Sequence, residues 1–361
     1  MKFFSYIEQQ IKKYTTNKQR PTVVDIHCYL SYGTPKTIIF KGRLLWSKFI
    51  RLNPSDGYWR NLVNMYHRFE SDEIADAHLS ISLGNESFTV RTDSEGFFEL
   101  QAHLQHPLNI NAGWTSYNVV VQQIGDEILQ QPEQGEGQIR IVPETATMGV
   151  ISDIDDTVIY TGVVSKTKML YTTLLNNAYT RNVFPGVAQL YWALCYGKQK
   201  NTDHTPQNPI FYVSNGPWNL YDLLIDVLYL NKMPFGPIAL RDFGWSKKNP
   251  TAYQQHKHRS IVKILQTYPQ LPFILIGDSG EKDTDIYLHI ARLFPKRILA
   301  IYIRNVQNPE RQQRILELIE QEEHHEVLLF DSSLDMAQHA LLNQYITLDN
   351  FQKVQAAMPL L

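Results

Sequence analysis

Three groups of polar residues in this sequence each follow an apolar run of the kind that forms a buried strand. They are SDIDDT at 152–157, SNGPW at 214–218 and GDSGEKD at 277–283. In open parallel sheets, ligands bind in the crevice beyond the carboxyl ends of the strands. We therefore expect the three groups to meet at one edge of such a sheet.

The first and third groups offer carboxylates for a hard metal ion. Asp153 and Asp155 are two residues apart, so an extended backbone directs both side chains to the same side. Two carboxylates at that separation repel each other, and a divalent cation removes the conflict. Asp278 and Asp283 can supply the remaining oxygen ligands that Mg²⁺ requires. Helix capping or turn formation is the alternative use of one acidic strand end, but neither requires all three groups to follow in order.

The elements that must position these residues begin at Met148, where apolar runs start to alternate with helical stretches. This alternation is typical of an α/β fold with a parallel sheet and crossover helices. The strands predicted here are residues 148–154, 210–215, 237–242, 273–278, 298–304 and 326–330. Helices are expected after Pro185, after Pro217, at 256–268, 284–294 and 309–323, and from Leu334.

The region before Met148 has a different pattern of short alternating runs separated by turn residues, with one helix expected at 58–69. Strands at this spacing indicate a β-sandwich or barrel. The predicted strands are 22–30, 37–46, 77–84, 86–93, 96–104, 117–124 and 138–143. We expect an amphipathic basic segment at 1–20, a smaller β-sandwich-like accessory domain at 21–143 and the parallel-sheet domain at 144–361.

Length and composition agree with a folded protein of two domains, because the chain has 361 residues, of which 43% are hydrophobic and 12% aromatic. A net charge of −2 provides no global attraction to nucleic acid, so no nucleic-acid partner is expected. The two cysteines, Cys28 and Cys195, have neither disulfide-framework nor zinc-site spacing. With neither a signal peptide nor a membrane span recognisable, we expect a cytoplasmic protein, with peripheral membrane contact as the alternative.

The ordered motifs resemble those of haloacid dehalogenase-like phosphohydrolases: Asp153-x-Asp155-x-Thr157, Ser214 after a buried strand, Lys257 at a helix start, and GDSGEKD. More narrowly, DIDDTV, VSNGPW, LPFILIGDSGEKDTDIY and PKRILAIYIR look like the catalytic domain of actin-patch-type Mg²⁺-dependent phosphatidate phosphatases, relatives of the lipins. The resemblance covers about residues 145–345. It implies a Rossmann-like haloacid dehalogenase sheet flanked by helices, and the β-rich segment also suits that family's architecture.

The resemblance implies a role for each acid. Asp153 would be the nucleophile that becomes an aspartyl-phosphate, and Asp155 would protonate the leaving alkoxide and then activate water. Mg²⁺ would be held by Asp153, the backbone carbonyl of Asp155, and Asp278, with Asp283 as a ligand or a support for one.

The resemblance also implies a phosphate-binding set. Ser214 and Lys257 would neutralise the phosphoryl oxygens, assisted by the backbone N–H groups of Asn215 and Gly216. Lys257 is preferred over Lys247, Lys248 and Lys263 because it opens the helical stretch HKHRSIVKIL.

Two neighbouring polar residues are given no such role. Asp156 has no catalytic assignment and is expected to cap a helix or orient its neighbours. Ser279 is expected to bond locally in its turn. A serine-hydrolase interpretation of GDSGE is disfavoured because nothing nominates a base and an orienting acid.

The expected reaction is hydrolysis of phosphatidic acid to diacylglycerol and inorganic phosphate, with an anionic phospholipid as the partner. The basic and aromatic stretch at 240–259, and the amphipathic segment at 1–20, suit an anionic lipid surface. A solvated loop and a helix packed on its own protein remain the alternatives. Two other functions stay open: hydrolysis of another phosphomonoester, and phosphatidate binding without turnover. Retention of both Asp153 and Asp155 argues against the latter. Protein partners are not predicted.

Overall fold

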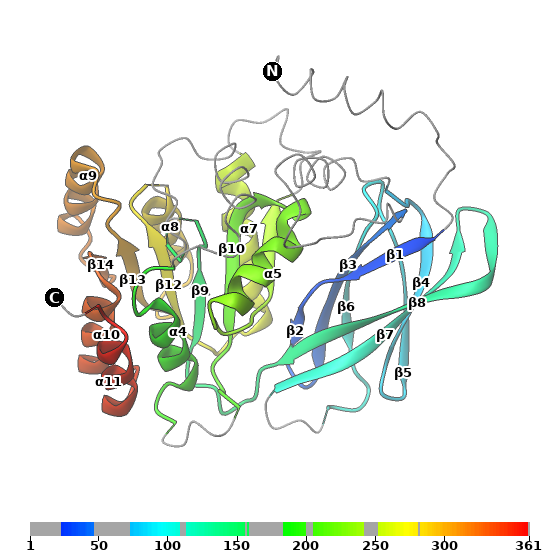
Figure 1. Cartoon of the computed structure of the whole chain (residues 1–361), viewed down its shortest axis with the longest axis horizontal. Helices are drawn as coiled ribbons and strands as arrows, with labels where there is room; N and C mark the ends of the chain where they lie inside the picture. The colour runs from blue at the N-terminus through cyan, green and yellow to red at the C-terminus, as the bar shows by residue number, and fades with distance from the viewer. Residues whose placement is uncertain are drawn as a thin grey trace, which may run out of the picture.

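A computed structural model describes residues 23–46, 73–108, 113–155, 157–158, 183–199, 205–241, 252–280 and 282–359. It contains two sheets that lie beside each other, one built only from strands and one covered by helices (Figure 1). The mixed α/β composition confirms the class expected from the sequence. Among the described helices, none combines the length and apolar character needed to cross a lipid bilayer.

The first sheet has eight strands and encloses one apolar core. Its strands are β1 Val24–Cys28, β2 Ser31–Gly33, β3 Thr37–Trp46, β4 Ala77–Leu83, β5 Glu86–Arg91, β6 Phe97–His103, β7 Gly113–Ile124 and β8 Glu127–Ile141. The order is β1-β3-β2-β8-β7-β4-β5, and β6 pairs with the free side of β3. Phe40, Ile81, Phe98 and Val119 come from four strands and share the core. A sandwich-like arrangement was expected, and these strands form one continuous hydrogen-bonded sheet.

Strand β8 is much longer than the predicted 138–143. Residues 127–137 were not predicted as strand because they have few apolar side chains. Their strand conformation comes from pairing with β7 over most of its length, with Tyr117 opposite Gly137. A Cβ atom at position 137 would lie 2.2 Å from Cζ of Tyr117, so only glycine admits this ring.

The second sheet is entirely parallel. Its strands are β9 Gly149–Ser152, β10 Ile210–Pro217, β11 Ile238–Arg241, β12 Phe273–Asp278, β13 Ile298–Arg304 and β14 Val327–Phe330. They lie in the order β11-β10-β9-β12-β13-β14. Numbered along the chain this is 3-2-1-4-5-6, the order of doubly wound α/β folds, in which the crevice for ligands opens where the winding reverses. Here the reversal lies between β9 and β12.

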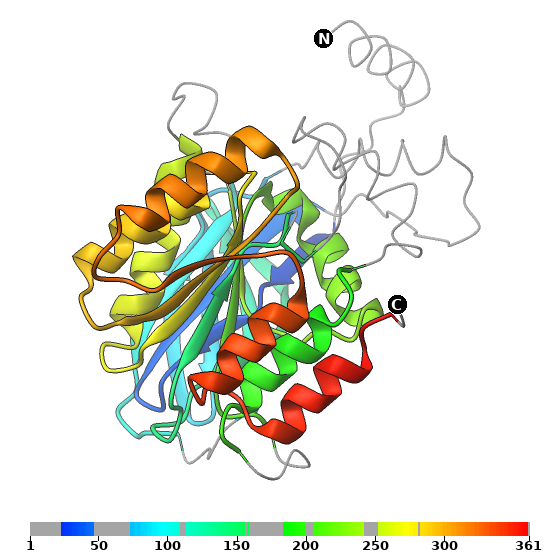
Figure 2. The same ribbon diagram turned by 90° about the vertical axis from the view of Figure 1, so that its left-hand side faces the viewer.

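Helices cover both faces of the parallel sheet (Figure 2). They are α4 Val187–Tyr196, η1 Trp218–Leu220, α5 Tyr221–Leu230, α7 Ala252–Thr267, α8 Asp283–Leu293, α9 Pro309–Glu320, α10 Ser333–Leu342 and α11 Leu348–Ala356. Helices α4, α5, α10 and α11 pack in one apolar core, and α7, α8 and α9 pack in a second core on the opposite face. This produces three layers, with Ile151 and Leu275 of the sheet facing one core and Val150 and Ile274 facing the other.

The strands and helices predicted from Met148 onward are confirmed, and local caps define several helix starts. Ser332 forms a capping box with Asp335, and the side chain of Asn308 accepts the N–H of Arg311 ahead of α9. Helix α11 was not predicted. The expected helices at 1–20 and 58–69 lie outside the described residues.

Candidate active site

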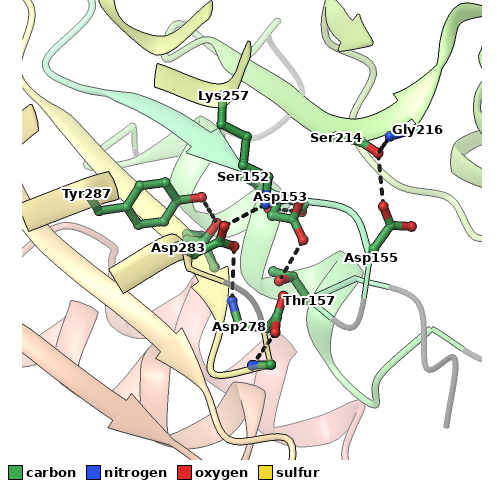
Figure 3. Close-up of polar contacts among 12 residues, drawn as sticks. Ser152, Asp153, Asp155, Thr157, Ser214, Gly216, Lys257, Asp278, Asp283 and Tyr287 are labelled. Atoms are coloured by element: carbon green, nitrogen blue, oxygen red, sulfur yellow. Dashed lines mark hydrogen bonds and ion pairs between the residues drawn. The ribbon is translucent and has the colours of Figure 1, made fainter. Parts of the chain in front are cut away.

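The three polar groups meet at the carboxyl edge of the parallel sheet, around the point where the winding reverses (Figure 3). Asp153 directly follows β9, and its N–H donates to the carbonyl of Ile276 at 2.8 Å. Ser214 belongs to β10 and Asp278 ends β12, the two strands that flank β9. The convergence expected from three strand ends is present in this structure.

A lysine at the centre of the site links two of the acids. The Nζ atom of Lys257 lies 2.8 Å from Oδ1 of Asp153 and 2.5 Å from Oδ1 of Asp283. All three residues are 0% exposed. Burial removes the solvation of each charge, so their attraction must replace it, and loss of one partner from such a pair costs about 3–5 kcal/mol. Lys257 thereby ties α7 to the end of β9 and to the start of α8.

The acids also form a donor set suited to a divalent cation. Asp153, Asp278 and Asp283 each offer a carboxylate oxygen, and these oxygens lie within 4.8 Å of one another. All three residues are buried. Among the described residues, Lys257 is the cation that forms ion pairs with them, through Asp153 and Asp283. One ammonium group against three carboxylates leaves excess negative charge. Hard oxygen ligands at this spacing fit Mg²⁺.

Backbone close to Asp278 is shaped around the neighbouring acid. A Cβ atom on Gly277 would lie 2.5 Å from Oδ2 of Asp283 and 2.9 Å from the ring of Tyr287, which explains the glycine of this motif. The N–H of Asp278 donates to Oδ2 of Asp283 at 3.4 Å, and the N–H of Gly280 donates to Oδ1 of Asp278. Burial, with a smaller contribution from the charge of Asp283, raises the pKa of Tyr287 well above its usual value.

Asp155 has a different set of partners from Asp153. The hydroxyl of Ser214 donates to Oδ2 of Asp155 at 2.9 Å and accepts the N–H of Gly216 at 2.9 Å. Asp155 is partly buried, and so is Asn215, which lies next to Ser214 in β10. The N–H of Gly216, which was expected to contact phosphate, therefore bonds within its own strand in this structure.

Lys257 and Ser214 thus lie with different acids, Lys257 with Asp153 and Asp283 and Ser214 with Asp155 (Figure 3). All eight residues predicted for the site belong to the described chain. Asp156 lies outside it, as do Lys247 and Lys248. The hydroxyl of Ser279 accepts the N–H of Val306 at 3.0 Å, so it bonds just past the end of the neighbouring strand β13 and not locally in its turn as expected.

Two residues that shape the site were given no role from the sequence. The hydroxyl of Thr157 donates to Oδ2 of Asp153 at 3.3 Å, and the carbonyl of Thr157 accepts from Nε of Arg304 at 3.1 Å. The buried guanidinium of Arg304 also stacks on Phe184, 4.1 Å from its centroid. The threonine was visible in the motif, and an arginine ending an apolar strand was the available signal for Arg304.

The comparisons with known proteins place the site within one family match. Residues 148–305 match the family described as "Phosphatidate phosphatase APP1, catalytic domain". Phosphatidate phosphatase APP1 of Saccharomyces cerevisiae is 35% identical over 163 residues, which are 45% of this chain and 26% of that protein. An uncharacterized protein of Schizosaccharomyces pombe is 28% identical over 223 residues, 61% of this chain and 34% of that protein.

Residues 148–305 are thus similar to the catalytic domain of an actin-patch-type phosphatidate phosphatase, the family that the motifs resemble. The chain spans about a quarter to a third of the length of these two relatives. A carbohydrate acetylesterase from Xanthomonas citri overlays on 77% of this chain and 68% of its own, at 10% identity and a TM-score of 0.28, a likeness too low to carry an argument.

A histidine next to the central lysine has a lowered pKa. His256 precedes Lys257 on α7 and is partly buried. Burial lowers the pKa of His256 to about 4. The charges of Lys41, Arg241 and Lys257 act in the same direction, and a hydrogen bond with the backbone of Ala239 opposes them. The folded protein thus keeps this imidazole neutral where an unfolded chain would begin to protonate it.

We expect the free energy of unfolding to decrease as the pH falls from 6.5 to about 4. In this window the unfolded state binds the proton and the folded state does not, so acid favours unfolding, by up to about 3 kcal/mol. Urea unfolding at several pH values should show a smaller decrease for His256→Gln than for wild type. If the free energy of unfolding falls equally with pH in the two proteins, His256 is not the group responsible.

Proposed function

We propose that this protein is a Mg²⁺-dependent phosphatidate phosphatase that releases diacylglycerol and inorganic phosphate. The observation that carries the proposal is the buried group of Asp153, Asp278, Asp283 and Lys257 at the carboxyl edge of the sheet, inside a domain that matches this phosphatase family. A yeast relative of that family is named as a phosphatidate phosphatase. The strand order supports a haloacid dehalogenase-like Rossmann fold for residues 144–361, with residues 21–143 as its accessory domain and 1–20 as a basic N-terminal segment.

Asp153 is the nucleophile in this proposal. One of its carboxylate oxygens forms a bond to phosphorus, the bond from phosphorus to the diacylglycerol oxygen breaks, and an aspartyl-phosphate results. Lys257 and Thr157 hold the two oxygens of Asp153 from different sides and so fix the direction of attack. Since phosphate-ester hydrolysis is among the slowest reactions without a catalyst, orientation and charge neutralisation must both be large.

Asp155 is the general acid and then the general base. It gives a proton to the departing alkoxide and then takes one from the water that attacks phosphorus. The bond from phosphorus to Asp153 breaks, inorganic phosphate leaves, and the protons balance over one cycle. Its bond with Ser214 at 2.9 Å sets the position of its carboxylate. Ser214 and Lys257, with the loop of Asn215 and Gly216, bind the phosphoryl oxygens.

Asp153, Asp278 and the backbone carbonyl of Asp155 would hold Mg²⁺, with Asp283 as a ligand or its support. When bound, the ion neutralises phosphoryl charge that the lysine alone does not balance. The substrate in this proposal is an anionic phospholipid reached by a cytoplasmic protein through peripheral contact with the membrane. Residues 242–251 of the basic stretch expected to make that contact lie outside the described residues. Of its described cations, Arg241 and Lys257 are buried and Arg259 is exposed.

The function is tested by phosphate release from phosphatidate in mixed micelles. We expect release that depends on Mg²⁺ and stops with excess EDTA, because the three carboxylates then lack their cation. Soluble phosphomonoesters at the same concentration serve as the comparison, and turnover of these alone would reject the lipid substrate. Undiminished turnover in EDTA would reject the metal.

Asp153→Asn should abolish phosphate release, because an amide oxygen is a poor nucleophile toward phosphorus. The protein should remain folded, as judged by circular dichroism. Turnover close to wild type in a folded Asp153→Asn protein would exclude this residue as the nucleophile.

Asp155→Asn should stop turnover while metal binding stays close to wild type, since only the backbone carbonyl of this residue is proposed to face the ion. Calorimetric titration with Mg²⁺ measures the binding, and the phosphate assay measures turnover. A large loss of Mg²⁺ affinity would instead make the Asp155 carboxylate a ligand.

A further inference from the structure

One face of the eight-stranded sheet carries a ladder of polar and aromatic side chains that meets the parallel-sheet region. Strands β3 and β6 are antiparallel neighbours in which Lys41 lies opposite Glu99 and Arg43 lies opposite Phe97. Because side chains alternate along a strand, these four share one face, while Phe40 and its neighbours face the core. The Nζ atom of Lys41 lies 3.1 Å from Oε2 of Glu99, and the guanidinium of Arg43 lies 4.4 Å from the centroid of Phe97.

This ladder holds Trp218, the residue that ends the segment SNGPW. The indole stacks on Tyr29 with ring centroids 4.4 Å apart and an interplanar angle of 24°. Its ring centroid also lies 5.8 Å from that of Phe97. Lys41 Nζ lies 4.5 Å from the centroid of the indole, in cation–π geometry. Trp218 is only 6% exposed as a result. The end of β10, which carries Ser214, is therefore followed by a side chain that the other sheet holds in place.

The start of the following helix is held by the same sheet. The N–H of Leu30 donates to the hydroxyl of Tyr221 at 2.7 Å, and Tyr221 also contacts Tyr29 with ring centroids 4.5 Å apart. The segment from Ser214 to Tyr221 is thus held at its C-terminal end by Tyr29 and Leu30, which are far away in the sequence.

The same ladder reaches the helix that carries the central lysine. Glu99 binds Lys41 through Oε2 and Lys263 of α7 through Oε1. Lys263 lies six residues after Lys257 on this helix, about 9 Å along its axis. Burial, with the nearby charge of Lys41, lowers the pKa of Lys263 to about 8. The carboxylate of Glu99 contacts both ammonium groups, one with each oxygen. Removal of Glu99 would release both contacts together.

We propose that Lys41 and Glu99 are positioning residues that fix the phosphate-binding half of the site, through Trp218 on one side and α7 on the other. Ser214 and Lys257 come from the two elements that this pair contacts, whereas Asp278 and Asp283 come from β12 and α8, across β9 from β10. The eight-stranded sheet is then a structural part of phosphate recognition. The proposal rests on the proposed function in taking Ser214 and Lys257 as the phosphate ligands.

Hydrogen exchange of the full-length protein tests the positioning without a substrate. Lys41→Met and Glu99→Gln should speed amide exchange in residues 214–221, roughly threefold to tenfold, as expected for loss of one cation–π or ion-pair contact. Amide exchange in β12 should stay unchanged. The variant Lys41→Arg keeps the cation and should therefore show the wild-type exchange pattern. Arg91→Met is the matched control, because it removes a cation of the same sheet whose ion pair with Asp76 is 62% and 60% exposed.

Kinetics supply a second measurement. The inhibition constant of inorganic phosphate should rise roughly threefold to tenfold in Lys41→Met and Glu99→Gln, by the same loss of contact. The Mg²⁺ concentration for half-maximal activity should not change, and Arg91→Met should leave both constants at wild-type values. A merely structural defect would move both constants or neither.

The outcomes separate the two proposals. Exchange at 214–221 that is equal in Lys41→Met and Arg91→Met, or that rises equally in β12, overturns the positioning role even if phosphatidate is hydrolysed. If wild type does not hydrolyse phosphatidate but the exchange response is confined to 214–221 and reversed by Lys41→Arg, the positioning stands and the proposed substrate falls.

Discussion

The structure depends on a lysine and its acids being buried together. Lys257, Asp153 and Asp283 are withdrawn from water, and each is tolerable inside the protein only because the others are within ion-pair distance. These residues come from α7, from the end of β9 and from the start of α8, so the ion pairs couple three separate elements. The close approach needs a glycine at position 277, where a side chain would collide with Asp283.

The order of the parallel strands explains why these charges can meet. Strand β9 lies between β10 and β12, and the chain winds to opposite faces on its two sides. The carboxyl ends of the three strands consequently lie side by side at one edge of the sheet, with Asp153 central, Ser214 on one side and Asp278 on the other. In the proposed mechanism, residues on the β10 side bind phosphate and residues on the β12 side hold the metal.

The family match covers residues 148–305, which include β9 to β13 and every residue proposed for the site. The eight-stranded sheet lies outside that match, yet Tyr29, Lys41 and Phe97 contact Trp218, which directly follows β10. Tyr29, Lys41 and Phe97 precede residue 148, so the matched region alone does not include these contacts. Our proposal assigns them a role in orienting the end of β10, which makes the two sheets one functional unit.

Much of the parallel-sheet region could be predicted from the sequence because its determinants are local. Continuous apolar runs marked the buried strands, and polar residues at three strand ends, above all Asp153 and Asp278, marked the site. The length of β8 and the existence of α11 were missed because pairing with β7 and packing on α4, not local periodicity, stabilise them. Only the tertiary structure decided that Lys257 bridges Asp153 and Asp283 and that Trp218 meets Lys41. Such pairings depend on distances between residues far apart in the chain, which residue types and spacing do not specify.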